Sequence, residues 1–88
     1  MLFADYIEYV WLPSKKSVVE KITYSEYTRE VREIAGYFRE RKIILAELSI
    51  RHIEDFYDAL RMKLSECTVQ KYHTKIHSAL RKAETDKI

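Results

Sequence analysis

The 88-residue chain has few residues that end or cross-link secondary structure, because it contains one glycine, one proline and one cysteine. Tight turns that need a positive φ are therefore scarce, which disfavours a meander of short strands. A lone cysteine, Cys67, excludes an internal disulfide and a thiolate cluster. We therefore expect a helical fold that does not depend on an oxidising compartment.

Long apolar runs are also missing. Asp5 and Glu8 interrupt the apolar residues 1–12, so no segment reaches the length of a signal peptide or a membrane span. We accordingly expect a cytoplasmic protein with no membrane partner. The 16 basic and 14 acidic residues give a formal net charge of only +2. Total charge therefore does not indicate a nucleic-acid partner, and any such argument must rest on where the charges lie.

What the chain does contain is a composition typical of a folded unit, with 47% hydrophobic and 34% charged residues. A chain of this length has room for one core. We therefore expect residues 1–88 to form a single domain, monomeric in isolation.

Apolar residues recur at helical spacing in four segments. The first, residues 2–12, should end or bend near Pro13 and bury Trp11. The second, residues 24–38, follows a predicted capping box made by Thr23 and Glu26. Residues 39–42 then form a charged connection, and we expect residues 43–48 to be a loop anchored in the core, because no second strand is available for pairing.

The third helix should follow Ser49 as N-cap, bury Ile50 among other apolar residues, and stop between residues 62 and 64. The fourth should run from residue 67 or 68 to about residue 84. Four helices with short links predict an all-α fold, a four-helix orthogonal bundle.

The fourth helix carries the sharpest functional signal. Between Cys67 and Lys82 there are four basic residues and no acidic one. Helical spacing arranges its polar residues in two adjacent rows. One row holds Lys71, Lys75, Ser78 and Lys82, and the other holds Gln70, Thr74, His77 and Arg81. Duplex DNA needs cations for phosphates and hydrogen-bonding groups for base edges. The plainer interpretation is the solvated side of an amphipathic helix.

A second basic cluster surrounds the start of the second helix, where Glu20, Glu26 and Glu30 dilute it. It comprises Lys15, Lys16, Lys21, Arg29 and Arg32. The hydroxyl of Thr23, together with unbonded N–H groups at a helix start, would suit a phosphate. Capping alone explains Thr23 equally well.

Other chemistries find little support in the sequence. His73 and His77 are four residues apart, but they lack an evident third ligand for zinc. Cys67 lacks the surroundings of a nucleophile, and we expect a half-buried thiol. We predict no catalytic residues, no metal and no cofactor, hence no enzyme activity in these residues.

Taken in order, the motifs of the chain resemble the core-binding, SAM-like domain of phage integrases, which are tyrosine recombinases. The resemblance covers nearly the whole chain and rests on these motifs: Phe3-Ala4-Asp5-Tyr6, Trp11-Leu12, Thr23-Tyr24 with Tyr27, Tyr37-Phe38, Leu48-Ser49, Ile53-Glu54-Asp55-Phe56-Tyr57, Thr68-Val69, and Ser78-Ala79-Leu80 with Ala83 and Ile88. Ile22 and Arg39 depart from the pattern, which bears on loop geometry more than on fold.

The resemblance implies that the second and fourth helices face the major groove of a recombination core site. It implies double-stranded DNA as partner, and a catalytic domain of the same parent chain following residue 88. With the charge pattern, it gives these candidate DNA-binding residues: Lys21, Thr23, Arg29, Thr68, Gln70, Lys71, Thr74, Lys75, Ser78 and Lys82. The alternative is a helical protein-interaction module that uses an apolar patch at residues 43–45.

Overall fold

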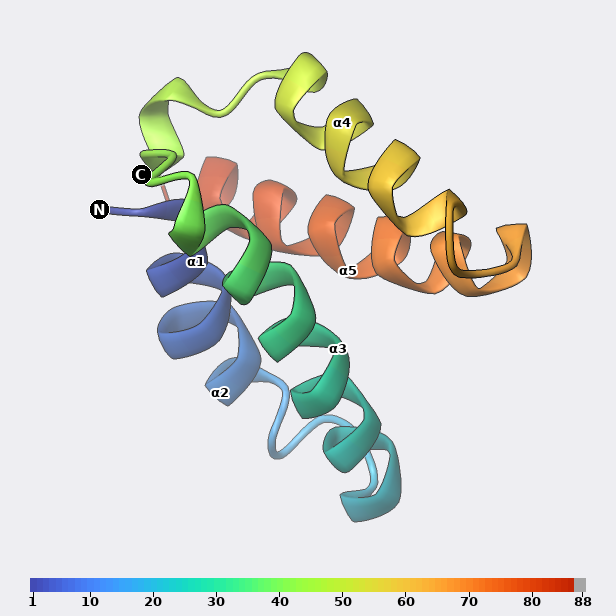
Figure 1. Ribbon diagram of the computed structural model, residues 1–88. Coiled ribbons are helices and arrows are strands. Elements are labelled where there is room, and N and C mark those ends of the chain that lie inside the picture. The colour runs from blue at the N-terminus through green and yellow to red at the C-terminus, as the bar shows by residue number, and fades with distance from the viewer. Residues whose placement is uncertain (87–88) are drawn as a thin grey trace. The chain divides into compact units, whose positions relative to one another are not determined.

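The computed structural model describes residues 1–86, and its regular elements are helices (Figure 1). The predicted all-α fold class is confirmed. The chain groups into two compact units, Met1–Leu45 and Ala46–Ile88. That residues 1–88 form one domain stays a prediction.

The first unit begins with a helical stretch in three parts: α1 (Phe3–Tyr6), a π-helical turn (Ile7–Trp11) and α2 (Leu12–Ser14). In the π turn, the N–H of Leu12 donates to the carbonyl oxygen of Ile7, five residues earlier. Pro13, which follows at once, has no N–H to donate to the preceding turn. The predicted first helix is confirmed, with this wider turn inside it.

Helix α3 (Lys21–Glu40) runs alongside α1 and α2 in the first unit (Figure 1). Aromatic rings join the two stretches. Phe3 meets Phe38 edge-on with ring centroids 5.0 Å apart, and Trp11 stacks on Tyr27 at 6.0 Å. Trp11 is only 2% exposed, so its predicted burial is confirmed. Such aromatic pairs combine a large buried apolar area with a preferred geometry.

The predicted start of this helix is wrong. Glu20 is the N-cap, with an extended backbone and no side-chain capping bond, and Thr23 lies in the first turn. Thr23 and Glu26 therefore do not form a capping box. The helix extends beyond both predicted ends, from Lys21 to Glu40.

The end of α3 forms a Schellman motif. The N–H of Ile43 donates to the carbonyl oxygen of Phe38 at 3.4 Å, and that of Lys42 donates to Arg39 at 3.1 Å. Lys42 occupies the left-handed position with φ of 54°, where glycine is usual. A side chain at that position costs about 1 kcal/mol.

The segment after this motif forms no strand, as predicted, but it does pair with the N-terminus at one point. Leu2 and Ile44 form an isolated antiparallel bridge. The N–H of Phe3 donates to Ile43 at 3.0 Å, and that of Leu45 donates to Met1 at 2.9 Å. The missing pairing partner was the backbone of residues 1–3, which sequence periodicity had placed within the first helix.

A 3₁₀ turn (Leu45–Glu47) leads to α4 (Ile50–Arg61). Ser49 is the N-cap, as predicted. It forms a capping box in which the N–H of Ser49 donates to Nδ1 of His52 at 3.1 Å. Met62 is the C-cap, within the predicted range. Ile50, predicted to be buried, is 73% exposed, because helical spacing places it about 120° from the buried Phe56.

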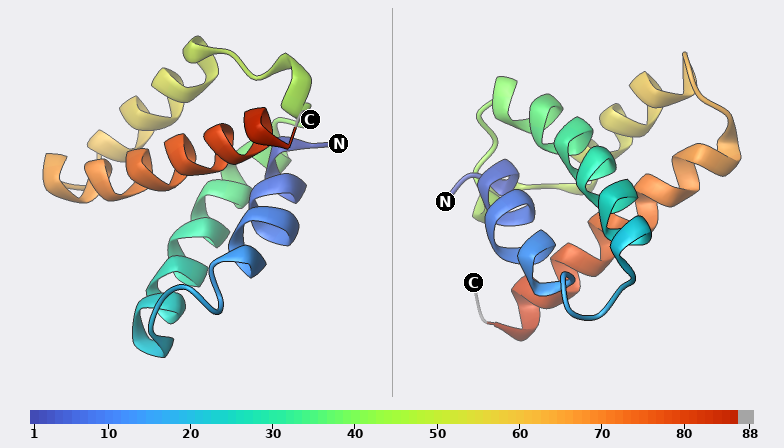
Figure 2. Two further views of the ribbon diagram at one scale, coloured as in Figure 1. Left: turned by 180° about the vertical axis from the view of Figure 1, so that it is seen from behind. Right: turned by 90° about the horizontal axis from the view of Figure 1, so that it is seen from below.

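Helix α5 (Glu66–Thr85) follows Ser65, whose hydroxyl accepts from the N–H of Thr68 at 3.4 Å. The helix starts one residue before the predicted range. It packs against α4, and both views of Figure 2 show the two helices as a hairpin. Phe56 of α4 meets Tyr72 of α5 with ring centroids 6.2 Å apart. The predicted inner stripe is largely confirmed, since Val69, Ile76, Ala79 and Ala83 are buried.

Candidate nucleic-acid interface

The outer row of α5 consists of Gln70, Thr74, His77 and Arg81, all of them exposed. These residues recur every three or four positions, opposite the stripe that includes Val69 and Ile76. The hydroxyl of Thr74 donates to the carbonyl oxygen of Gln70 at 3.0 Å, so its oxygen can still accept a hydrogen bond. This row offers a cation and three neutral polar side chains to solvent.

The neighbouring row of α5, which begins at Lys71, is partly buried. Lys71 is exposed, but Lys75 is only 9% exposed, and Ser78 is half-buried. Nζ of Lys82 lies 3.0 Å from Oδ2 of Asp86, an i,i+4 ion pair. Position 75 lies at the margin of the apolar stripe, where a lysine can bury its methylene groups. Of the predicted cations in this row, Lys71 is therefore the one most accessible to a ligand.

Thr68, which was placed in the candidate set by the resemblance, belongs to the start of α5. Its hydroxyl lies 3.1 Å from the hydroxyl of Ser65, the N-cap residue. The residue is half-buried. Its hydrogen bonds in the structure are therefore those of a helix start.

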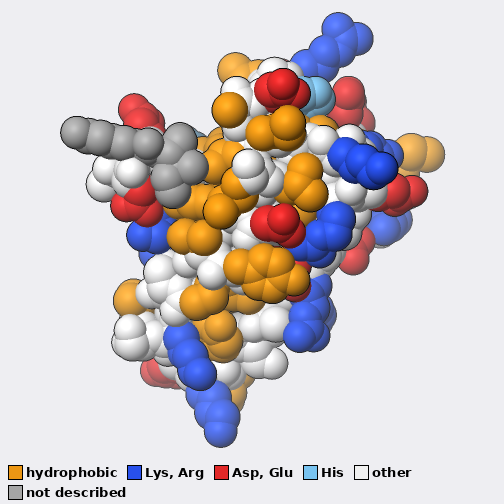
Figure 3. Space-filling model, turned by 90° about the vertical axis from the view of Figure 1, so that its left-hand side faces the viewer, with side chains coloured by type: hydrophobic (Ala, Val, Ile, Leu, Met, Phe, Trp, Pro, Cys, Tyr) orange, Lys and Arg blue, Asp and Glu red, His pale blue; other side chains and the backbone are white. Residues whose placement is uncertain are grey.

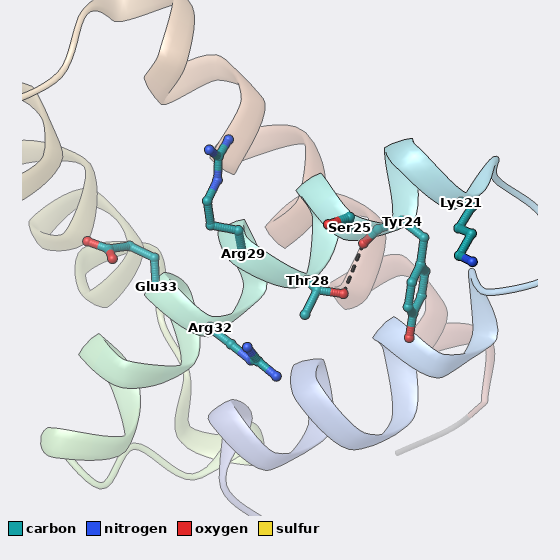
Figure 4. A pocket seen from close by; sticks show the side chains of 7 residues that line it. All are labelled: Lys21, Tyr24, Ser25, Thr28, Arg29, Arg32 and Glu33. Carbon is teal, nitrogen blue, oxygen red and sulfur yellow. Dashed lines mark hydrogen bonds between the residues drawn. The ribbon is translucent and has the colours of Figure 1, made fainter.

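The outer face of α3 holds the second group of predicted residues. An open depression on this face is lined by Lys21, Arg29 and Arg32. Thr23 is half-buried and directly precedes Tyr24, another lining residue. Figure 4 shows the lining side chains, with Arg29 and Arg32 pointing in different directions. The other residues that line the depression are Tyr24, Ser25, Thr28 and Glu33. The hydroxyl of Thr28 donates to the carbonyl oxygen of Tyr24 at 2.9 Å. The depression thus combines three cations with hydroxyl groups and one carboxylate.

Arg39 and Arg61 form ion pairs within the chain. Nη2 of Arg39 lies 2.9 Å from Oδ1 of Asp5 and 2.9 Å from Oε1 of Glu8. The hydrogen bond that Arg39 donates to Asp5, followed by the one it donates to Glu8, raises the pKa of the Arg39 guanidinium. Arg61 pairs with Glu66 and Asp58, both at 3.1 Å. On the face drawn in Figure 3, basic side chains are interspersed with acidic and hydrophobic ones.

On α5, His73 contacts Tyr57 of α4 and His77 of its own helix. Its Nδ1 lies 2.8 Å from the hydroxyl of Tyr57, and its ring stacks on that of His77 with centroids 5.9 Å apart. Burial raises the pKa of Tyr57 to about 12, against a smaller opposing effect of Arg61. Within residues 1–86, no group of three or more His, Cys, Asp or Glu side chains is arranged to hold a metal ion. Cys67 is exposed, so the predicted half-buried thiol is wrong.

A family model described as the phage integrase SAM-like domain matches residues 2–88. The chain belongs to this family. The suspected resemblance to the SAM-like domain of phage integrases is therefore confirmed. No curated protein and no solved structure matches the chain. None of the helices described in residues 1–86 combines the length and the apolar character needed to cross a bilayer.

The family match identifies the chain as a phage integrase SAM-like domain, and the structure shows which of its polar residues are exposed. His77 and Arg81 were absent from the predicted set, although their row had been recognised from helical spacing. Arg32 of α3 had been named in the second basic cluster but not in the predicted set, and Ser25 and Thr28 were not named. For His77, Arg81, Ser25 and Arg32, the signal is the angular distance from the buried stripe of each helix.

Proposed function

We propose that this phage integrase SAM-like domain binds double-stranded DNA at a recombination core site, as the DNA-binding part of a tyrosine recombinase. The family match over residues 2–88 carries the proposal. Strand cleavage would belong to a catalytic domain elsewhere in the parent protein, and these residues would supply contact with the duplex.

The charge pattern of α5 supports DNA as the partner. No acidic residue lies between Glu66 and Glu84, while Lys71 and Arg81 are exposed on this stretch. Phosphate contacts by such cations position a protein on the duplex, and neutral polar side chains such as Gln70 and Thr74 can reach base edges. We assign Lys71, Arg81 and the neutral members of the outer row to these two roles.

The outer face of α3 is the second proposed contact. Lys21, Arg29 and Arg32 would meet phosphates, and Thr23, Ser25 and Thr28 would add hydroxyl groups. Lys75 and Lys82 contribute less in this proposal, because the first is buried and the second is paired with Asp86.

Salt dependence of DNA binding tests the proposal. A fluorescent duplex should bind with non-specific Kd of roughly 10⁻⁴ to 10⁻⁶ M, and the affinity should fall as salt rises. Lys71→Ala should flatten the log–log salt slope by about one unit, while Lys75→Ala should change it much less. A salt-independent interaction, or no interaction with duplexes, would contradict a DNA-binding role.

The alternative is a protein-interaction module. In the patch at residues 43–45, the backbone pairs with residues 1–3, and Ile44 is 41% exposed. This alternative gains support from an apolar groove of about 340 Å³ in the second unit. Ile50, Ile53, Tyr57, Ile76 and Leu80 contribute its apolar lining. Binding in this groove should resist salt and should weaken in Ile53→Ala, which adds no charge and would leave DNA affinity nearly unchanged.

A further inference from the structure

Two of the three histidines in the chain lie one turn apart on α5. The rings of His73 and His77 are nearly parallel, with an interplanar angle of 25° and centroids 5.9 Å apart. They line a surface depression together with Thr74, Ser78 and Arg81. Two titratable rings, a guanidinium and two hydroxyl groups thus share one open site.

Tyr57 of α4 contacts the ring of His73. Its hydroxyl lies 2.8 Å from Nδ1 of His73, and the two rings meet edge-on with centroids 5.5 Å apart. Because burial raises the pKa of Tyr57 to about 12, its hydroxyl keeps its proton at neutral pH and can donate. A neutral histidine that accepts at Nδ1 carries its proton on Nε2, on the other side of the ring.

We propose that His73, His77 and Arg81 form a proton-dependent site for a DNA phosphate, and that Tyr57 is a positioning residue for His73. The proposal rests on the DNA-binding function proposed above and adds a regulation to it. With His73 neutral, Nε2–H is a donor directed away from Tyr57. With His73 protonated, Nδ1–H donates to the oxygen of Tyr57, so the ring keeps its orientation.

The electrostatics of the site favour an anion at low pH. Histidine side chains gain their charge between about pH 8 and pH 5. Two imidazolium rings at 5.9 Å repel one another, and a phosphate beside both offsets that repulsion. Binding of the phosphate and uptake of protons therefore favour each other, as linkage requires.

Charged groups on both α4 and α5 lie near these rings. Helix α4 packs against this part of α5 and brings Glu54, which lines the apolar groove with both histidines. It also brings Arg61, whose guanidinium lies 6.0 Å from the centre of the Tyr57 ring and pairs with Asp58. On α5 itself, Arg81 shares the depression. A bound phosphate would therefore lie beside the Arg81 guanidinium as well as the two rings.

Binding of a fluorescent duplex to the full chain near pH 6 and near pH 8 tests the site. Affinity should rise about tenfold at the lower pH, with a salt slope steeper by about one unit. His77→Gln keeps a hydrogen-bonding side chain without the charge and should remove most of this pH dependence. The matched control is His52→Gln, which preserves the capping box of α4 and should leave the pH dependence intact.

Nitrogen-15 chemical shifts of the imidazoles test the positioning role without DNA. In the wild-type chain, neutral His73 should carry its proton on Nε2. Tyr57→Phe should give a mixture of tautomers and a smaller change of DNA affinity with pH. A proton on Nδ1 of neutral His73, or a pH profile unchanged by Tyr57→Phe, would overturn this role.

The outcomes separate the two proposals. Duplex binding that is equally strong near pH 6 and pH 8, or equally pH-dependent in His77→Gln, overturns the phosphate site and leaves the DNA-binding function standing. No duplex binding at either pH overturns both.

Discussion

Helices α3 and α5 have the same length of 20 residues and the same number of basic residues, four each. They differ in where carboxylates lie. Helix α3 contains Glu26, Glu30, Glu33 and Glu40, distributed along its length, whereas α5 contains only Glu66 and Glu84, near its ends. An anion that approaches the middle of α5 meets cations without acidic neighbours on that helix.

This comparison teaches that the distribution of charge matters more than its total. A formal net charge of +2 is too small to attract DNA as a whole. Debye screening limits exposed charges to a range of about 8 Å at physiological salt, so a phosphate responds mainly to its nearest side chains. We therefore expect α5 to contribute more of the salt-dependent affinity, because carboxylates such as Glu33 lie beside the cations of α3.

The largest expected effect concerns the inner side of α3. Trp11→Ala would remove the ring that stacks on Tyr27, and it should lower the free energy of unfolding by about 3 to 5 kcal/mol. Urea denaturation followed by circular dichroism would measure it. A loss below about 1 kcal/mol would mean that α3 does not depend on this packing.

The two helix starts give the next contrast. Ser65→Ala removes the side-chain cap of α5 and should cost about 1 kcal/mol, because the N–H of Thr68 loses its acceptor. Thr23→Ala in the first turn of α3 should cost no more than about 0.5 kcal/mol, since Thr23 is not the cap. Thermal unfolding of both variants would measure the two losses of stability. Equal losses would restore Thr23 as a capping residue.

Helix starts show how far the sequence predicts this fold. Ser49 was found because the apolar stripe of α4 begins directly after it. Thr23 was misassigned because Thr-x-x-Glu fits a capping box, yet Glu20 adopts the extended N-cap backbone without a side-chain bond. Backbone dihedral angles, which the pattern does not encode, determined the real start.

A smaller effect, in the stabilising direction, is expected in the middle of α3. Gly36 lies in the helix interior, and a Cβ placed there would meet no atom within 4 Å. Gly36→Ala should therefore raise the free energy of unfolding by about 0.5 to 1 kcal/mol through backbone entropy. Denaturant midpoints would measure the gain, and a destabilised variant would contradict the open surroundings of this position.

At the C-terminal end of α3, we expect a similar gain in stability when glycine replaces a residue with a side chain. Lys42→Gly would relieve the left-handed backbone at φ of 54° and should stabilise the chain by up to about 1 kcal/mol. Lys63→Gly, in the turn that follows α4, serves as a control that should not stabilise. An equal effect at both positions would argue against strain at Lys42.

The sequence predicted the two polar rows of α5, but it did not predict how exposed each residue of these rows is. The run without acidic residues identified α5, and helical spacing gave both of its polar rows. Charge then favoured the row with Lys75, but that position borders the buried stripe and the lysine is 9% exposed. The bond between Tyr57 and His73 joins residues 16 positions apart on different helices, which one-helix periodicity cannot reveal.

The central claim is that α5 carries the larger share of duplex binding. The direct test compares two double charge reversals with the same change of net charge, Lys71→Glu with Arg81→Glu on α5 and Arg29→Glu with Arg32→Glu on α3, in a salt titration of duplex affinity. All four positions are exposed, so both variants should fold. We expect the α5 variant to lose about two units of salt slope and the α3 variant to lose less. An equal or larger loss for the α3 variant would contradict this account.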